Sequence, residues 1–193
     1  SSIIKIFDMT AAATGINEKT AKALGIDTDK VILSPMNHAG YYPGGELMTM
    51  KVLFEKETYR ILGAQIIGFQ GVDKRIDVLA TAIRARMKAH QLIDLDLAYA
   101  PPYSSAKDPV NMAGYIVENI KNGVVKQWYY EDVEKLPRDG SATLLDVRTP
   151  AEYARGHVEG FVNIPVDELR EHIDELEKTK PVYVICQSGL RSY

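Results

Sequence analysis

The residues with the clearest chemical potential stand at the end of the chain, in Val184-Ile185-Cys186-Gln187-Ser188-Gly189-Leu190-Arg191-Ser192. Cys186, the only cysteine, follows an apolar run and precedes Arg191 by five positions. A thiol at the end of a buried strand, among the N–H groups of a turn and beside a guanidinium, is stabilised as a thiolate. A thiolate of low pKa is a nucleophile, and the same donors can hold the anionic group that it acquires. The sequence therefore predicts covalent chemistry at Cys186.

The elements that must position this loop are short strands that alternate with helices. We expect strands at 144–147, 162–164 and 182–185, a small helix at 150–154 and an amphipathic helix at 167–176. Short parallel strands with intervening helices indicate an open α/β sheet whose site lies at the carboxyl ends of the strands. Cys186 stands at such an end.

The preceding part of the chain follows another pattern, that of an α+β module. We expect strands at 3–8 and 31–34, a hairpin of 48–54 with 60–68, and helices at 18–24, at 73–89 and from Pro109 to a stop at Gly123. The last helix carries an apolar stripe that marks core or a subunit interface: Met112, Ala113, Ile116, Val117 and Ile120. The pattern changes near 124–130, so we expect domains at 1–125 and 126–193.

Bulk composition excludes several classes of function. The chain has 193 residues, of which 25% are charged and 46% apolar, as in ordinary globular proteins. A net charge of −3 argues against a nucleic-acid partner, and the apolar runs are too short to span a membrane. One cysteine rules out an internal disulfide framework and indicates a reducing compartment, so we expect a cytoplasmic protein.

Motifs of the second domain occur in the order of a known family. They are Leu145-Asp146-Val147-Arg148-Thr149, Glu152-Tyr153, Gly156-His157-Val158, Asn163-Ile164-Pro165 and the cysteine loop. With them the chain from about residue 127 onward resembles a rhodanese domain. The resemblance implies that Cys186 takes up a sulfane sulfur as a persulfide and passes it to a thiol. The implied loop around that sulfur consists of Gln187, Ser188, Gly189, Leu190, Arg191 and Ser192.

Loop length separates this family from cysteine-dependent phosphatases of related fold, which place five residues between cysteine and arginine. Here four residues intervene, which resembles the tighter sulfurtransferase loop. Arg191 either compensates the charge on Cys186 or braces the loop against Asp146 or another acid. Asp146 and Arg148 match family positions that support the loop, and we expect a structural ion pair between them. We expect His157 to bond the backbone rather than to act as a base.

The first domain also carries a resemblance. The strings Asn37-His38-Ala39-Gly40-Tyr41-Tyr42-Pro43-Gly44 and Ala100-Pro101-Pro102-Tyr103-Ser104-Ser105 are similar to the C-terminal dimerisation domain of flavin-dependent pyridine nucleotide-disulfide oxidoreductases. The nearest subgroup is that of coenzyme A-disulfide reductases and NADH-dependent persulfide or polysulfide reductases, some of which carry a fused rhodanese domain. The resemblance implies a homodimer that uses FAD, NADH and coenzyme A.

Tyrosines of this domain reach the partner subunit's redox cysteine and the coenzyme A thiol in that subgroup. The matching residues here are Tyr103 and either Tyr41 or Tyr42, and a phenol beside a leaving thiolate can donate a hydrogen bond or a proton. For Tyr103 we favour this function. For Tyr41 and Tyr42, packing of the rings in a turn is an equal alternative.

The chain also departs from a complete enzyme of that subgroup. It has no glycine-rich dinucleotide fingerprint and no flavin-proximal cysteine, so we expect that it binds neither FAD nor NADH by itself and contains no metal site. Both ends interrupt an element, and the helix that follows the cysteine loop in rhodaneses is missing. We therefore expect a piece of a longer protein, with an incomplete rhodanese domain, that is inactive alone.

The sequence thus predicts the C-terminal portion of a fused coenzyme A-disulfide, persulfide or polysulfide reductase. It supplies the dimer surface, the tyrosines and a cysteine that carries sulfane sulfur. Two alternatives stay open. One is a dimerisation module with a catalytically silent rhodanese-like tail, which the spacing of Cys186 and Arg191 opposes. The other is a phosphatase or arsenate reductase, which the short loop opposes.

Overall fold

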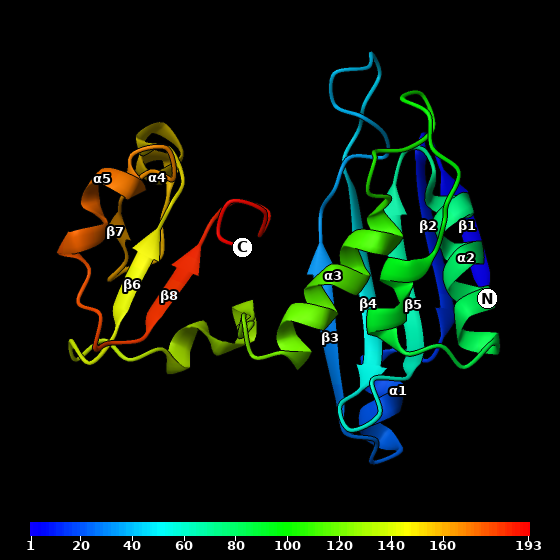
Figure 1. Ribbon diagram of the computed structural model, residues 1–193, viewed down its shortest axis with the longest axis horizontal. Coiled ribbons are helices and arrows are strands. Elements are labelled where there is room, and N and C mark those ends of the chain that lie inside the picture. Colours follow the sequence, from blue (N-terminus) through cyan, green and yellow to red (C-terminus); the bar gives the residue numbers. More distant parts are fainter. The chain divides into compact units, whose positions relative to one another are not determined.

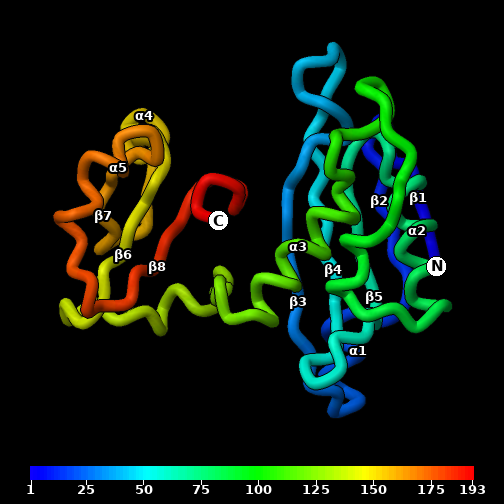
Figure 2. The backbone as a smooth tube through the Cα atoms, in the orientation of Figure 1, coloured from blue at the N-terminus to red at the C-terminus, as the bar shows by residue number.

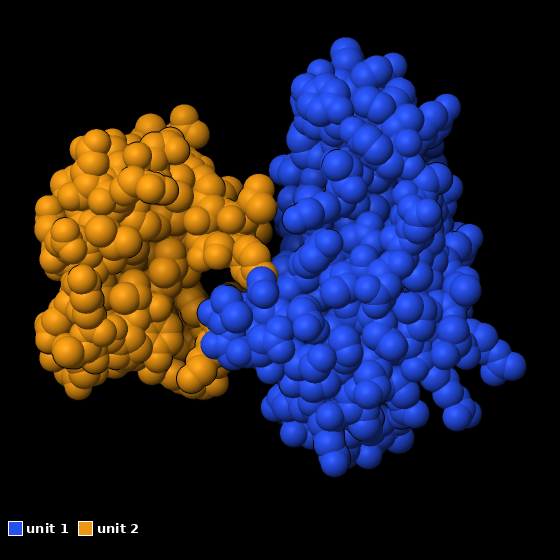
Figure 3. Space-filling model, viewed as in Figure 1, with its two compact units in different colours: residues 1–125 blue, residues 126–193 orange.

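The computed structural model describes residues 1–193, which form two compact units, Ser1–Val125 (unit 1) and Lys126–Tyr193 (unit 2) (Figures 1 and 3). Each unit has a buried apolar cluster of its own. None of the helices is long and apolar enough to cross a membrane.

Unit 1 is an antiparallel five-stranded sheet with two long helices on one face (Figure 1). The strand order is β1-β2-β5-β4-β3, and every neighbouring pair is antiparallel. The strands are β1 (Ser2–Ile6), β2 (Met9–Gly15), β3 (Thr28–Leu33), β4 (Met48–Glu55) and β5 (Ile61–Gly68). The helices are α1 (Glu18–Ala23), α2 (Val72–Arg84), the 3-10 helix η1 (Ala89–Asp94) and α3 (Pro109–Lys121).

The core of unit 1 lies between the sheet and helices α2 and α3. Alternate residues of β4 are buried there, from Met48 at 1% exposure to Phe54 at 1%. Helix α3 begins as the sequence predicts, because Asp108 accepts the Val110 N–H at 3.0 Å and Pro109 fills the first turn. All five residues of its apolar stripe pack in this core cluster, so the stripe belongs to the core.

Two expectations for unit 1 are wrong. The sequence pattern gave no strand for Met9–Gly15, which is β2, because alanine is depleted in strands and its run there carries no β signal. The helix expected at 73–89 ends at Arg84, since the chain leaves the helix at Arg86 with φ 58°. The Met87 N–H then bonds the Ala82 carbonyl at 3.0 Å, and η1 follows.

Unit 2 has three parallel strands in the order β7-β6-β8 (Figure 1). They are β6 (Thr143–Asp146), β7 (Val162–Asn163) and β8 (Val182–Ile185), with helices η2 (Tyr130–Lys135), α4 (Pro150–Arg155), α5 (Leu169–His172) and η3 (Ile173–Glu175). The helix expected at 167–176 is therefore broken into α5 and η3. Carboxylates at Asp174 and Glu175 oppose the dipole at a helix C-terminus, which disfavours continuation there.

The register of unit 2 brings the chemistry to one edge of its sheet. Asp146 of β6 pairs with Ile185 of β8 and with Asn163 of β7. Cys186 follows Ile185 directly, so the cysteine loop begins at the carboxyl edge where β6 also ends (Figure 2). The expected fold class is confirmed: an antiparallel sheet with helices, followed by a parallel α/β unit.

Candidate functional site

The thiol of Cys186 lies half-buried inside the loop that follows β8. Its Sγ accepts the Gly189 N–H at 3.1 Å and the Ser192 hydroxyl at 3.4 Å. Gly189 has φ 88°, in the left-handed region that favours glycine. This conformation belongs to the turn whose N–H groups surround the sulfur.

The loop favours the thiolate form of Cys186. Burial by itself raises the pKa of the thiol, but the Ser192 hydroxyl and the N–H groups of Ser188, Ser192 and Gly189 outweigh it. The pKa of Cys186 is therefore lowered. A lowered thiol pKa increases the thiolate fraction at neutral pH, and the thiolate is the nucleophile.

Arg191 closes the loop through a bidentate ion pair with Glu152 of α4. Its Nη1 and Nη2 donate to the two carboxylate oxygens at 2.8 and 2.7 Å. The bonds from Arg191 and then from the Thr149 N–H lower the pKa of Glu152 to about 2. Of the acids considered from the sequence, Asp146 is not the partner of Arg191, because it is engaged elsewhere.

Asp146 pairs with Arg148 at the end of β6. The Arg148 Nη2 lies 2.7 Å from a carboxylate oxygen of Asp146, which is fully buried, and it also donates to the Gly156 carbonyl at 2.9 Å. This pair fixes the strand end beside the loop. The His157 Nδ1 lies 3.1 Å from the Tyr153 carbonyl oxygen, and the His157 ring stacks on Tyr153, so it contacts no reacting group.

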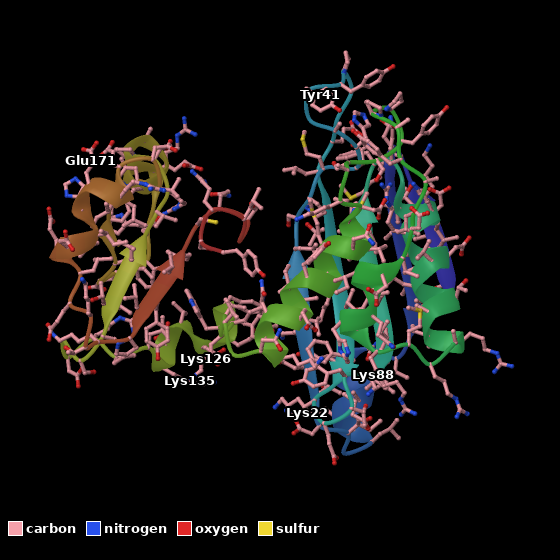
Figure 4. The ribbon with its side chains drawn as sticks, in the orientation of Figure 1. Lys22, Tyr41, Lys88, Lys126, Lys135 and Glu171 are labelled. Carbon is pink, nitrogen blue, oxygen red and sulfur yellow. The ribbon has the colours of Figure 1, made fainter.

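The tyrosines of unit 1 occupy two neighbouring turns. Tyr41 stands at the tip of the segment between β3 and β4 (Figure 4), is 77% exposed, and shares a hydrogen bond of 3.0 Å with the Tyr99 hydroxyl. That bond raises the pKa of Tyr99. Tyr42 instead packs edge-on against His38, with ring centroids 5.7 Å apart. Tyr103 is 71% exposed. Tyr41 and Tyr103 are thus the most exposed of the three, whereas Tyr42 is 42% exposed and also has a packing contact.

The two turns are joined to each other. The Ala39 N–H donates to the Ser104 carbonyl at 3.0 Å. Between the turns lies a cavity of about 390 Å³, whose lining includes His38, Lys74, Tyr99 and Tyr103. The loops that carry Tyr41 and Tyr103 therefore form one surface of unit 1.

Sequence reasoning missed three residues of these sites. Glu152 stood in a quoted motif without a role, although the Thr149-x-x-Glu152 capping box was readable. Tyr99 lies outside the quoted strings and gave no signal. Arg75 is buried on the core face of α2 beside Ile76 and Leu79, and a charged residue within an apolar stripe was the available signal.

The glycine turn between β5 and α2 does not form the cradle of a dinucleotide-binding unit. The segment Gly68-Phe69-Gln70-Gly71 joins β5 to α2, but β5 is antiparallel to both of its neighbours. The Arg75 guanidinium also fills the space that a Cβ at Gly71 would enter, so this glycine accommodates a side chain of its own unit. No group of three or more His, Cys, Asp or Glu side chains is arranged to hold a metal ion.

The fold and the loop define a class of protein: a module with an antiparallel sheet followed by a parallel α/β unit whose cysteine loop surrounds a thiol with N–H and O–H donors. A family model described as the dimerisation domain of pyridine nucleotide-disulphide oxidoreductases matches residues 1–110, and one described as a rhodanese-like domain matches 129–193. The chain belongs to the pyridine nucleotide-disulphide oxidoreductase family through its dimerisation domain, and a rhodanese-like domain follows. The resemblance seen in the motifs is confirmed.

Curated relatives and solved structures agree with this assignment. Coenzyme A disulfide reductases of Staphylococcus epidermidis and Staphylococcus haemolyticus are 42% and 43% identical, over 60% and 62% of this chain. The chain spans 26% and 27% of their lengths. It is also similar to the structure of reduced Bacillus anthracis CoADR-RHD, with 46% identity, a TM-score of 0.93, and coverage of 100% of this chain and 34% of that one. It is similar as well to the structure of an NAD-dependent persulfide reductase from A. fulgidus, with 41% identity, a TM-score of 0.84, and coverage of 99% of this chain and 34% of that one.

Proposed function

We propose that Cys186 carries sulfane sulfur. Its thiolate attacks the outer sulfur of a donor such as thiosulfate, the S–S bond of the donor breaks, and sulfite leaves with the bonding electron pair. The product is a persulfide at Cys186. A thiolate acceptor then attacks the terminal sulfur, forms its own persulfide and returns Cys186 as a thiolate, so no external oxidant or reductant enters this transfer.

The observation that carries this proposal is the set of donors around the sulfur. The N–H of Gly189 and the hydroxyl of Ser192 already point at Sγ, at 3.1 and 3.4 Å. The same turn can hold the charge of a terminal sulfur, as preorganised dipoles do in other sites. Arg191, fixed by Glu152, contributes a positive charge nearby.

The acceptor that we propose is coenzyme A, and the setting is a homodimeric coenzyme A-disulfide, persulfide or polysulfide reductase. Support comes from the names of the curated relatives and from the persulfide reductase among the similar structures. We assign FAD and NADH to other domains of that reductase, because residues 1–193 carry neither a glycine-rich dinucleotide fingerprint nor a flavin-proximal cysteine. We derive no step through either cofactor.

Within that reductase we assign a role to Tyr41 and Tyr103 across the dimer. Their hydroxyls donate a hydrogen bond to the thiolate that leaves when a coenzyme A disulfide is cleaved. The exposure of both rings supports this role. Tyr42, whose ring packs on His38, is assigned to the turn alone.

A loading experiment tests the sulfur-carrier function. The full-length protein is incubated with thiosulfate and desalted, and we expect a gain of about 32 Da on the peptide that holds Cys186, which cyanide removes as thiocyanate. Cys186→Ser must show neither the gain nor thiocyanate. Ser141→Ala, on an exposed turn of the same unit, is the matched control and must load like the wild type.

The loading experiment and a turnover assay together decide between this function and its two alternatives. A silent rhodanese-like tail gains no mass at Cys186 under any donor concentration. A phosphatase or arsenate reductase turns over phosphate esters or arsenate through Cys186, and the four-residue spacing to Arg191 predicts no such turnover. Absence of the sulfur adduct would overturn the proposal, and turnover of a phosphate ester or arsenate through Cys186 would do so in favour of the second alternative.

A further inference from the structure

We propose that Arg75 is a positioning residue for the two tyrosine turns, an inference that rests on the proposed role of Tyr41 and Tyr103. Arg75 belongs to the first turn of α2 and makes no hydrogen bond to either phenol. It acts by fixing the backbone on which both phenols are mounted.

One guanidinium binds both turns at once. The Arg75 Nη2 donates to the Asn37 carbonyl at 2.8 Å, at the start of the turn that carries Tyr41. The same nitrogen donates to the Tyr103 carbonyl at 3.3 Å. The backbone bond between Ala39 and Ser104 ties the turns together above it. A displacement of Arg75 therefore moves both turns and not one alone.

A buried carboxylate holds the guanidinium in place. The Asp108 carboxylate accepts from the Arg75 Nη2 at 2.9 Å and from Nε at 3.2 Å, and it also accepts the Ser104 hydroxyl at 2.7 Å. Arg75 is 1% exposed and Asp108 3%, so water does not compete for these bonds. We call Arg75, Asp108 and Ser104 the clamp.

The backbone at Gly71 also restricts where the Arg75 guanidinium can lie. Arg75 Nη1 donates to the Gly71 carbonyl at 3.2 Å, and it fills the space where a side chain at residue 71 would begin. Gly71 has φ 74°, which only glycine adopts without strain. The planar, forked guanidinium can bind three carbonyls and a carboxylate together, whereas the ammonium of lysine has three donors and no fixed plane.

The first test is hydrogen exchange on the full chain, which needs no cofactor and no activity. In Arg75→Lys we expect the amides of Ala39 and Tyr103 to exchange at least tenfold faster than in the wild type. The amides of β4 in the core should not change. Arg84→Lys, on the exposed side of the same helix, is the matched control and should leave both turns as they are. Unchanged exchange in both turns of a folded Arg75→Lys protein would overturn the proposal.

A milder variant covers the case in which Arg75→Lys does not fold. Ser104→Ala removes the hydroxyl that bonds Asp108 and leaves Arg75 in place. We expect about threefold to tenfold faster exchange at the same two amides. Exchange at the wild-type rate in this variant would also count against the clamp.

The second test uses the full-length reductase and separates positioning from independent effects. We expect Arg75→Lys to lower kcat for coenzyme A disulfide about tenfold with little change in KM, and Tyr103→Phe to do the same. In the double variant the losses should overlap, so that kcat falls little further. Losses that multiply to about a hundredfold would show that Arg75 does not act through the tyrosine turns.

The two tests distinguish failure of this inference from failure of the proposed function. If Tyr41→Phe and Tyr103→Phe keep full activity, the proposed role of the phenols is wrong. The exchange rates still decide whether Arg75 holds the turns.

Discussion

Asp108→Asn removes one negative charge from the interior of unit 1 and replaces a carboxylate oxygen that accepts from Arg75 and Ser104 with an NH2 donor. Asparagine serves as well as aspartate at a helix N-cap, so its amide oxygen keeps the bond from the Val110 N–H. The Arg75 guanidinium then stays buried without the carboxylate that neutralises it. We expect a large loss in the free energy of unfolding of unit 1 at neutral pH.

The size of that loss follows from the burial of the pair. Removing one partner of a buried ion pair costs about 3–5 kcal/mol because the other charge is left uncompensated. The side chains of Arg75 and Asp108 are 2% and 4% exposed, so water screens the pair little and we expect a loss within that range. In a domain of this size such a loss lowers the Tm by roughly 10–20 °C.

The effect has a definite pH dependence. Burial by itself raises the pKa of Asp108, but the bonds from Arg75, Val110 and Ser104 outweigh it, so the pKa lies below its ordinary value. A carboxyl with a depressed pKa stabilises the folded protein above its unfolded pKa, and this contribution is lost as the pH falls through the folded pKa. The difference in the free energy of unfolding between wild type and variant should therefore decrease below about pH 4.

Urea denaturation followed by circular dichroism measures the free energy of unfolding of the wild type and the variant. It is carried out at pH 7 and again below about pH 4. Trp128 is the only tryptophan and lies in unit 2, so its fluorescence follows the other unit and should show an unchanged transition. Asp77→Asn, on the exposed face of α2, is the matched control. A loss below about 1 kcal/mol at pH 7, or an equal loss at both pH values, would refute the reasoning, because a buried pair cannot be that weak or insensitive to protonation.

Three further predictions concern the loop, the sheet and the turns. Ser192→Ala removes a donor to the site cysteine and should raise the pKa of the thiol, measured by alkylation against pH. Gly63→Ala should destabilise unit 1 by about 3 kcal/mol or more in urea denaturation, because its Cβ would collide with the Ile16 carbonyl oxygen. In the full-length reductase, Tyr41→Phe should lower kcat about tenfold and Tyr42→Phe less than twofold. An unchanged thiol pKa in Ser192→Ala would contradict the role of that hydroxyl, and an unchanged free energy of unfolding in Gly63→Ala would contradict the close packing there. Equal losses of kcat for Tyr41→Phe and Tyr42→Phe would contradict the different roles of these two tyrosines.

Strands and helices with a strong apolar period could be predicted from the sequence. The alternation of β4 and the apolar run of β8 gave strands whose bounds differ from the structure by one residue at most. Strand β2 escaped because its alanines have no strand preference, and it exists because β1 and β5 pair with it on either side. Local propensity cannot report such tertiary pairing.

The candidate sites also divide into contacts within a short segment, which the sequence can reveal, and contacts that only the fold brings together. The cysteine loop could be read because its donors stand within six residues of the thiol they surround. The pairs Arg191 with Glu152 and Arg75 with Asp108 join residues 39 and 33 positions apart, and only the fold brings them together. Glu152 stands in a quoted motif and Asp108 directly before the predicted helix at Pro109, but their partners depend on how the strands and helices pack.

The account depends most on the ionisation of the Cys186 thiol at neutral pH. Since this is the only thiol of the chain, the rate of its reaction with iodoacetamide across pH 5 to 10 reports its pKa without interference. We predict a midpoint below the ordinary cysteine value of about 8.5, with the urea-unfolded chain returning to that value. A folded midpoint at or above that of the unfolded chain would contradict the central claim.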